Sequence, residues 1–405
     1  MKDDKKVPQL RFPEFTDAWK QRKLGEIIDY SNGIGHENYV LPQGKYELVT
    51  LKSINSSGKL VCSEKFVNED FETLKAETLI MMLSEQAKGM LGMTTIIPCD
   101  NKYVLNQRVA ALKAHNDVEV NFLTNAINNK QNYFEQMGAG TKVQNITRGH
   151  VEECVIELPS LEEQKKIGSL FSKLEVTITL QQRKLNSLQK LKKGLLQKMF
   201  PKNGENIPEI RFPKFSDAWK QRELCSLTKR IQGNDGRMDL DILTISAGNG
   251  WMKQEERFSG NIAGKEQKNY TLLHKGELSY NHGNSKLAKY GAVFSLQNFE
   301  EALVPRVYHS FKMLSGSAKF IEYYFATKLP DRELGKLISS GARMDGLLNI
   351  KYDDFMGIKL TIPSEMEQHK ISTFFSKLDN TITLQQRKLE SLQKLKKGLL
   401  QQMFI

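Results

Sequence analysis

The chain lacks the residue patterns of secreted, membrane and metal-stabilised proteins. Its four cysteines, Cys62, Cys99, Cys154 and Cys225, lie far apart and form no CxxC pair. A disulfide framework and a zinc site are therefore not expected, and reduced thiols are the simpler interpretation. No apolar run approaches the roughly 18 residues that a membrane-spanning helix needs. The basic start at residues 1–6 has no apolar segment behind it, so we expect no signal peptide and predict a cytoplasmic protein.

Sequence signatures of catalysis are missing as well. The chain has no GxxxxGK[ST] phosphate loop, no HExxH zinc motif and no Asn/Asp-Pro-Pro-Tyr/Phe tetrad, which is typical of amino-methyltransferases. The pair of glycines in residues 33–35 lacks the third glycine of a dinucleotide-binding turn, and the charged residues 330–336 have the wrong spacing for a nuclease site. We therefore predict a chain that is not an enzyme, has no catalytic or metal site and carries no cofactor of its own.

The composition favours a polyanionic partner. The 405 residues include 59 Lys and Arg against 47 Asp and Glu, a formal charge of +12. This excess favours nucleic acid, because cationic side chains that neutralise phosphates release bound counterions. The length suits two domains, since single cores rarely grow beyond about 250–300 residues.

An internal repeat sets the organisation of the chain. Residues 7–27 recur at 207–227 with 12 of 21 positions identical, and residues 174–200 recur at 378–404 with 23 of 27 identical. The chain is therefore two tandem units.

The interiors of the two units differ. Residues 28–137 and 228–338 share only a faint order of elements. A constant frame around unlike interiors indicates that the frame has one common task while each interior has its own. The alternative is that two redundant domains have diverged evenly by drift, but drift does not explain the high identity of the frame.

Each unit ends in a segment with a helix start signal. Ser160 with Glu163, and Ser364 with Glu367, fit a capping box in which the glutamate reaches back to the N–H of the cap. A 3–4 spacing then continues for about five heptads without proline, which predicts a coiled coil. The spaced positions are Ile167, Phe171, Leu174, Ile178, Gln181, Leu185, Leu188, Lys192, Leu195 and Met199, then Ile371, Phe375, Leu378, Ile382, Gln385, Leu389, Leu392, Lys396, Leu399 and Met403.

The two predicted helices are natural partners for each other. A pseudo-two-fold axis between the units would make the pair antiparallel. At about 1.5 Å per residue, each helix would be close to 58 Å long, which corresponds to one or two turns of B-DNA at about 34 Å per turn. We interpret the helices as a ruler that sets a distance between the two interiors.

Polar positions within the helices leave alternatives open. Gln181 and Gln385 occupy stripe positions, where they either fix the register of the pair or remain partly solvated amides. Residues 181–200 hold six basic side chains and no acid. This run is either a solvated face or a contact surface for DNA or an acidic protein.

The frame contains two duplicated motifs. They are Pro8-x-Leu10-Arg11-Phe12-x-x-Phe15-x-x-x-Trp19-x-x-x-x-Leu24-Gly25, copied from Pro208 to Leu224, and Pro159-x-x-x-Glu163-Gln164-x-x-Ile167, copied from Pro363 to Ile371. With these motifs in this order and the heptads behind them, the chain resembles the specificity subunit of type I restriction–modification enzymes, and the resemblance covers the whole chain. One departure is Cys225, which stands where the first copy has Gly25.

The resemblance implies an α+β fold with two mixed α/β target-recognition domains in pseudo-two-fold arrangement, separated by two long helices in an antiparallel coiled coil. The expected boundaries are 1–158 and 203–362 for the recognition domains, and 159–202 and 363–405 for the spacer helices. Each domain would read one half of a bipartite, asymmetric site in double-stranded DNA. The frame would dock two modification subunits, which bring S-adenosylmethionine and methylate adenine. Restriction subunits using ATP and Mg would then join to translocate and cut.

Candidate DNA contacts are polar and basic side chains in loops of the interiors. In the first domain they follow a strand-like segment at 78–83 and lie in the glycine-rich segment 138–145. Arg108 and Arg306 occupy matching places, so we predict structural roles for them. The candidate contacts are Gln86, Lys88, Lys142, Gln144, Asn145, Asn281, His282, Asn284, Lys286 and Arg343. The predicted coiled-coil and partner-docking positions are Ile167, Phe171, Leu174, Ile178, Leu185, Leu188, Leu195, Ile371, Phe375, Leu378, Ile382, Leu389, Leu392 and Leu399.

A scaffold protein with two divergent protein-binding domains on a coiled coil is the alternative function. Sequence-specific, salt-dependent binding to duplex DNA separates the two hypotheses.

Overall fold

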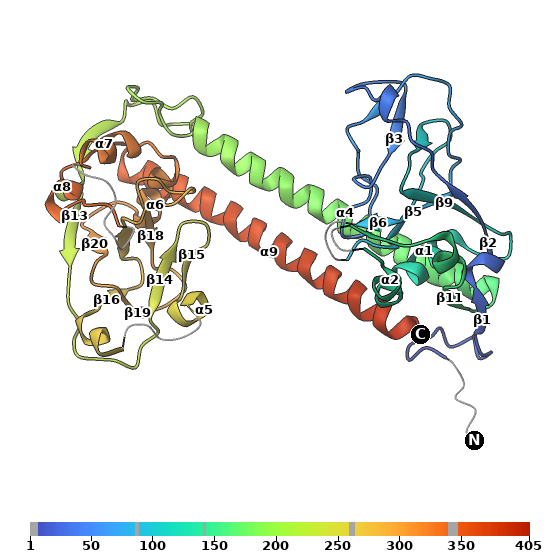
Figure 1. Cartoon of the computed structure of the whole chain (residues 1–405). Coiled ribbons are helices and arrows are strands. Elements are labelled where there is room, and N and C mark those ends of the chain that lie inside the picture. Colours follow the sequence, from blue (N-terminus) through green and yellow to red (C-terminus); the bar gives the residue numbers. More distant parts are fainter. Residues whose placement is uncertain (1–6, 86–88, 141–142, 259–263, 339–346) are drawn as a thin grey trace. The chain divides into compact units, whose positions relative to one another are not determined.

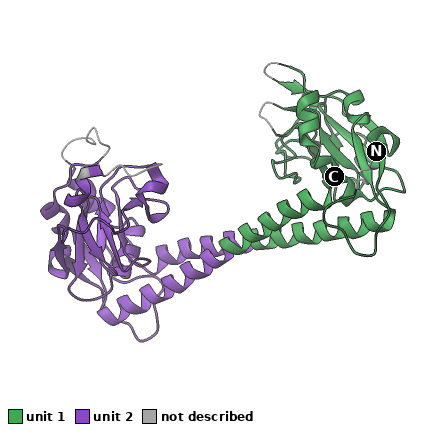
Figure 2. Cartoon of the chain, turned by 90° about the horizontal axis from the view of Figure 1, so that it is seen from below, with its two compact units in different colours: residues 1–183, 386–405 green, residues 184–385 purple. Residues whose placement is uncertain are grey.

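The computed structural model describes residues 7–85, 89–140, 143–258, 264–338 and 347–405, which fold into two compact units (Figure 1). Unit 1 comprises residues 1–183 and 386–405, and unit 2 comprises residues 184–385 (Figure 2). Both boundaries fall within the long helices α4 (Leu161–Lys198) and α9 (Glu365–Met403). Each unit therefore combines one interior domain with a stretch of both helices.

A four-stranded antiparallel sheet forms the centre of unit 1, in the order β2-β9-β5-β7. All four residues of β5 are buried, because both faces of the strand are covered. Leu79 and Met81 pack with Phe122 of α1, while Ile80 and Met82 point to the other face, as alternating strand residues must. The elements of this sheet are β2 (Ile28–Asn32), β5 (Leu79–Met82), β7 (Thr94–Ile96), β9 (Val109–Ala114) and α1 (Val120–Asn128).

Shorter elements complete the first domain. A three-stranded sheet has the order β4-β3-β8, with β3 and β8 parallel, and two strand pairs join β1 to β11 and β6 to β10. The bounds are β1 (Lys20–Lys23), β3 (Tyr46–Val49), β4 (Phe66–Val67), β6 (Ser84–Glu85), β8 (Tyr103–Leu105), β10 (Gln144–Asn145), β11 (Val155–Leu158), α2 (Gln131–Met137) and α3 (Arg148–Glu152), with 3-10 turns at Leu24–Glu26 and Glu37–Tyr39.

Unit 2 repeats the central sheet in the order β13-β20-β17-β18, again antiparallel and again followed by a helix, α6. The weak similarity between residues 28–137 and 228–338 in the order of their elements therefore reflects a central sheet that both domains share. The bounds are β12 (Lys220–Glu223), β13 (Thr228–Ile231), β14 (Leu243–Ser246), β15 (Gly250–Lys253), β16 (Thr271–His274), β17 (Leu278–Asn281), β18 (Ala292–Ser295), β19 (Glu301–Val304), β20 (His309–Met313), β21 (Lys359–Ile362), α5 (Gln254–Phe258), α6 (Ala318–Ala326), α7 (Asp331–Lys336) and α8 (Tyr352–Met356), with 3-10 turns at Leu224–Leu227 and Gly264–Asn269.

Each core takes its central phenylalanine from the helix of the other repeat. In unit 1, Phe404 follows the end of α9 and stacks on Phe122 at 5.3 Å between ring centroids. It also lies edge-on to Trp19 at 6.4 Å. In unit 2, Phe200 follows the end of α4, stacks on Phe320 at 5.5 Å and lies edge-on to Trp219 at 5.9 Å. Each domain is thus completed by a residue from a distant part of the chain.

The predicted pairing of the helices is confirmed within each unit. In unit 1 the first part of α4 lies beside the last part of α9, and in unit 2 the roles are exchanged, so the helices run antiparallel (Figure 2). The stripe residues Ile167, Phe171, Leu174, Ile178, Leu185, Ile371, Phe375 and Leu389 are buried, and Leu188, Leu195, Leu378, Ile382, Leu392 and Leu399 are half-buried.

The polar stripe positions behave in two ways. The amide oxygens of Gln181 and Gln385 are buried without a hydrogen-bond partner among the described residues. Lys192 and Lys396 instead make ion pairs across the two helices. The contacts that can fix the register of the helix pair are therefore made by the two lysines and not by the two glutamines.

The capping boxes form differently from the prediction. Ser160 Oγ accepts from the N–H of Glu163 at 3.3 Å, as expected. The carboxylate of Glu163, however, accepts two hydrogen bonds of 2.7 Å from Arg11 rather than bonding the N–H of the cap. Arg211 holds Glu367 in the same way in unit 2. A charged, two-pronged donor outcompetes a single neutral N–H, so this pair links the two motifs of the frame.

In the described part of the chain, no helix combines the length and the apolarity that crossing a membrane requires.

Candidate nucleic-acid interface

The central sheet of unit 1 brings the two predicted loop segments together at one end. Beyond β5, the short strand β6 pairs with β10, so that Glu85 lies opposite Gln144 and Ser84 opposite Asn145. The hydroxyl of Ser84 also donates to the side-chain oxygen of Asn145. The chain then continues from β10 with the N–H of Ile146 bonded to the carbonyl of Leu83 at 2.9 Å. Two segments about 60 residues apart in sequence thus form one edge.

Buried Glu85 holds the first of these segments. Its side chain is 5% exposed, and its carboxylate accepts from the N–H groups of Met90 at 2.7 Å and Leu91 at 2.8 Å. The carboxylate therefore ties together the two ends of the loop. Among the predicted contacts, Gln144 is half-buried and Asn145 exposed, whereas Gln86, Lys88 and Lys142 lie outside the described residues.

Unit 2 makes the matching arrangement at the end of β17. The N–H of Leu348 donates to the carbonyl of His282 at 2.8 Å, and Gly283 forms an isolated bridge with Leu347. The two segments are again distant in sequence and again meet beyond the central strand. Asn284 and Lys286 are exposed here, and Arg343 lies outside the described residues.

Two of the predicted contacts in unit 2 have structural roles. His282 is 5% exposed, with Nδ1 2.7 Å from the carbonyl oxygen of Leu348 and Nε2 2.9 Å from that of Val307. This burial is at odds with a direct contact between His282 and DNA, because both ring nitrogens are occupied. Half-buried Asn281 likewise bonds the carbonyl of Ile245 at 3.2 Å and the N–H of Gly283 at 3.1 Å. Both side chains hold the loop.

A turn before the second strand of the central sheet, β9 or β20, borders each of these edges. In unit 1 the turn between β8 and β9 contains Arg108, and in unit 2 the turn between β19 and β20 contains Arg306. The prediction that these arginines are structural is wrong for their side chains. Both are exposed, and neither guanidinium has a hydrogen bond or ion pair within the described ranges.

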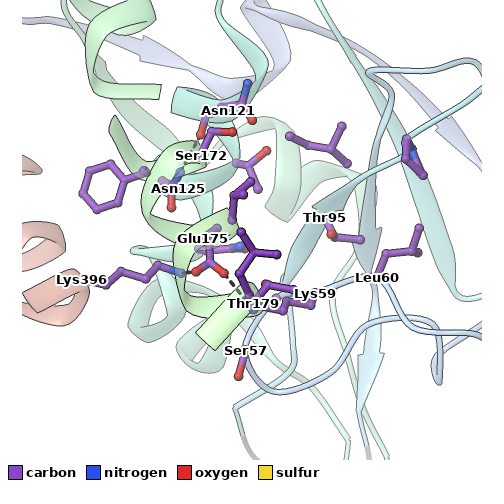
Figure 3. A pocket seen from close by; sticks show the side chains of 18 of the residues that line it. Ser57, Lys59, Leu60, Thr95, Asn121, Asn125, Ser172, Glu175, Thr179 and Lys396 are labelled. Carbon is purple, nitrogen blue, oxygen red and sulfur yellow. Dashed lines mark hydrogen bonds and ion pairs between the residues drawn. The ribbon is translucent and has the colours of Figure 1, made fainter. Parts of the chain in front are cut away.

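A cleft lies between the domain and the helices in each unit. In unit 1 it has a volume of about 620 Å³. Glu175 on α4 forms ion pairs there with Lys396 and, at 3.0 Å, with Lys59 (Figure 3). Burial raises the pKa of Glu175, but its contacts with Lys396 and Lys59 outweigh this effect and hold the pKa below the usual value. The carboxylate is therefore charged and paired.

The cleft of unit 2 measures about 420 Å³ and contains the repeat counterpart of this acid, Asp379. Its carboxylate lies 2.6 Å from Lys192 Nζ and accepts from the hydroxyl of Tyr323 at 2.7 Å. These ion pairs were not predicted, although a lysine that interrupts an apolar stripe at the same place in both repeats was a signal for a facing acid. No cluster of three or more His, Cys, Asp or Glu able to hold a metal occurs among the residues that the structure describes.

Comparison with known proteins agrees with this architecture. A relative, the type I restriction enzyme MjaVIII specificity subunit of Methanocaldococcus jannaschii, is 21% identical over 418 residues, which cover 98% of this chain and 93% of the relative. The crystal structure of a type I restriction–modification S subunit from M. genitalium superposes with a TM-score of 0.64 at 15% identity and covers 98% of this chain and 99% of its own.

The family model matches twice. Residues 16–190 and 220–394 each fit the type I restriction modification DNA specificity domain, and together they span most of the chain. The two matches coincide with the two repeats, each with its own central sheet and its own paired loop segments. The chain therefore belongs to the family of type I restriction–modification DNA specificity subunits and carries two specificity domains.

Proposed function

We propose that this chain selects the DNA target of a type I restriction–modification complex, and that each domain reads one half of a bipartite, asymmetric site. The observation that supports this most is the matched edge in the two domains. Both join a loop beyond the central strand, β5 or β17, to a second segment by backbone pairing, while the side chains on those segments differ. A common backbone with unlike side chains suits two readers of different sequences, since side chains in the grooves carry the sequence information.

The candidate readers are the exposed or half-buried side chains on these edges. We propose Gln144 in the first domain and Asn284 and Lys286 in the second, because amides and cations bond base edges and phosphates. Asn145 is exposed and remains a candidate, although its amide also bonds Ser84 and the carbonyl of Val143. Gln86, Lys88, Lys142 and Arg343 belong to the same segments and remain candidates from sequence.

The frame suits docking of partner subunits. Its near-identical copies, residues 159–202 and 363–405, present the same surface twice, which supports two modification subunits. The recognition domains then span 1–158 and 203–362. In this proposal the modification subunits bind S-adenosylmethionine and methylate adenine, the restriction subunits use ATP and Mg to translocate and cut, and the assembly works in the cytoplasm. The chain itself contributes no catalytic group.

The helices would set the spacing between the two half-sites. Four residues inserted after Arg183 lengthen α4 by about 6 Å. We expect the complex to tolerate a longer gap between half-sites than the parent does. If the tolerated gap between half-sites does not change, the helices do not set the spacing.

Equilibrium binding tests the recognition role itself. The complex of this chain with its modification subunits is titrated against duplexes that carry the genomic adenine-methylation motif, and against scrambled duplexes of equal length. We expect tighter binding to the motif by about 10³-fold or more, as sequence-specific proteins show. Equal affinity for both duplexes would favour the scaffold alternative.

A further inference from the structure

One turn occupies the same position in both domains and carries an arginine in each, at its second residue in unit 1 and at its first residue in unit 2. Arg108 lies between β8 and β9, and Arg306 lies between β19 and β20. The strands that follow, β9 and β20, are the second strands of the two central sheets. The turn is therefore a shared feature of two domains whose sequences otherwise differ.

In each unit the turn contacts the reading edge, the paired loop segments beyond β5 or β17 that carry the candidate DNA contacts. The carbonyl oxygen of Arg108 accepts from the N–H of Leu83 at 3.0 Å, directly before β6. The carbonyl oxygen of Val307, next to Arg306, lies 2.9 Å from Nε2 of His282, directly after β17. Arg108 in unit 1 is thus attached through its backbone to the start of the loop that we propose to meet DNA, and in unit 2 the residue after Arg306 makes the corresponding attachment.

The two guanidinium groups are left without protein partners. Some arginines of the chain are paired: Arg11 with Glu163, Arg211 with Glu367, and Arg237 with Glu301. Arg108 and Arg306 are exposed and have no comparable contact within the described residues. Both cations are therefore available to an anionic ligand.

The backbone at Arg108 adds an independent observation. Its φ is 65°, in the left-handed region that glycine and asparagine adopt far more readily than a long side chain does. Among the residues that the structure describes, no side-chain contact compensates for this conformation, which Arg306 does not share. Unfavourable backbone conformations of this kind concentrate at ligand-binding positions.

We propose that Arg108 and Arg306 bind phosphate groups of duplex DNA, one in each half-site, and position the reading edges on the target. This inference rests on the proposed function. Phosphate is the ligand because two domains that read different bases share the turn, and the phosphate backbone is the part of DNA that does not vary. The guanidinium fork suits phosphate oxygens.

The test uses the complex with its modification subunits, carrying Arg108→Asn, Arg306→Asn or both. Asparagine removes the charge and tolerates the left-handed conformation at residue 108. Lys113→Gln and Lys312→Gln are matched controls. Each removes one exposed charge from β9 or β20, about 16–20 Å further along the chain from the turn at about 3.3 Å per residue. Binding is measured between 0.05 and 0.3 M KCl, on the motif duplex and on a scrambled duplex.

We expect each arginine variant to lose about five- to tenfold in affinity at about 0.1 M salt on both duplexes. The slope of log K against log salt should fall by about 0.9 for each lost phosphate contact, and by about twice that in the double variant. Arg108→Lys and Arg306→Lys should restore most of the affinity.

The inference would be overturned if the Arg108→Asn and Arg306→Asn variants bound DNA as tightly as the controls Lys113→Gln and Lys312→Gln. A loss confined to the motif duplex with an unchanged salt slope would also overturn it, because that result marks a base contact. In both cases the unmodified complex still prefers the motif duplex. If the unmodified complex has no such preference, the proposed function itself fails, and the two failures are distinguishable.

Discussion

The ammonium group of Lys192 on α4 lies 2.6 Å from the carboxylate of Asp379 on α9, and their repeat counterparts, Lys396 and Glu175, form the same pair with the helices exchanged. The two ion pairs therefore follow the internal repeat. Each joins the end of one helix to the beginning of the other, and its charged groups are half-buried beside a cleft.

Reversing the charges of one ion pair should change the free energy of unfolding in a non-additive way. Lys192→Glu or Asp379→Lys alone places like charges together, and each should lower the free energy of unfolding by about 1 kcal/mol. The double exchange restores an opposite-charge pair and should recover most of that loss. Urea unfolding of the four proteins measures the coupling. Strictly additive losses would show that the contact contributes nothing.

The phenylalanine that each helix inserts into the other repeat's domain should stabilise that domain selectively. Phe404→Ala empties a core position beside Trp19 and Phe122, and a loss of about 3–5 kcal/mol is typical of such truncations. Hydrogen exchange should then rise in α1 of unit 1 and stay unchanged in α6 of unit 2. Phe200→Ala should give the reverse pattern.

Ile405 is the matched control for this experiment. It follows Phe404 and is 38% exposed, so Ile405→Ala removes apolar atoms that are not in the core. Its exchange pattern should follow the parent. Equal protection loss in both units after either phenylalanine substitution would contradict the selective role.

Only part of this architecture could be predicted from the sequence. The helices, their antiparallel pairing and the repeated domains follow from the heptad spacing and the duplicated motifs. The motifs that contain Arg11 and Glu163 are both visible in the sequence. Their contact could not be predicted, because nothing in the local sequence shows that the arginine lies beside the glutamate. The same limit applies to Phe404, which is a helix end in sequence and a core residue in space.

The candidate interface shows a similar division. Polar loops can be picked out by composition, but the pairing of β6 with β10 is a tertiary contact. Burial of His282 likewise depends on the carbonyl groups of Leu348 and Val307, which come from two distant segments. Arg108 was assigned a structural role because it matched Arg306, although the match reflects a shared exposed turn.

Acid should weaken unit 2 through His309. Burial lowers the pKa of this imidazole to about 4, with further lowering from His282 and Arg230 and partial opposition by its hydrogen bond to the carbonyl of Ile350. The folded state therefore favours the neutral ring. The corresponding stability is present above the ordinary value of 6.5 and is lost as the pH falls towards 4.

Between pH 7 and pH 5 this single group should remove about 2 kcal/mol from the free energy of unfolding. His309→Gln should reduce that pH dependence, as measured by urea unfolding at the two pH values. His369→Gln, which removes an exposed imidazole on α9, is the control and should follow the parent. An unchanged dependence in the His309 variant would contradict the assignment.

The most direct test of the two-reader account is the adenine-methylation motif written by loop variants. The chain and its modification subunits are expressed in a host without adenine methylation, with Gln144→Ala or Asn284→Ala, and the modified genomic sites are sequenced. We expect Gln144→Ala to relax or change one half of the bipartite motif and Asn284→Ala to affect only the other half, while the spacing stays constant. A change in both halves from either variant, or a motif with a single undivided half, would contradict this expectation.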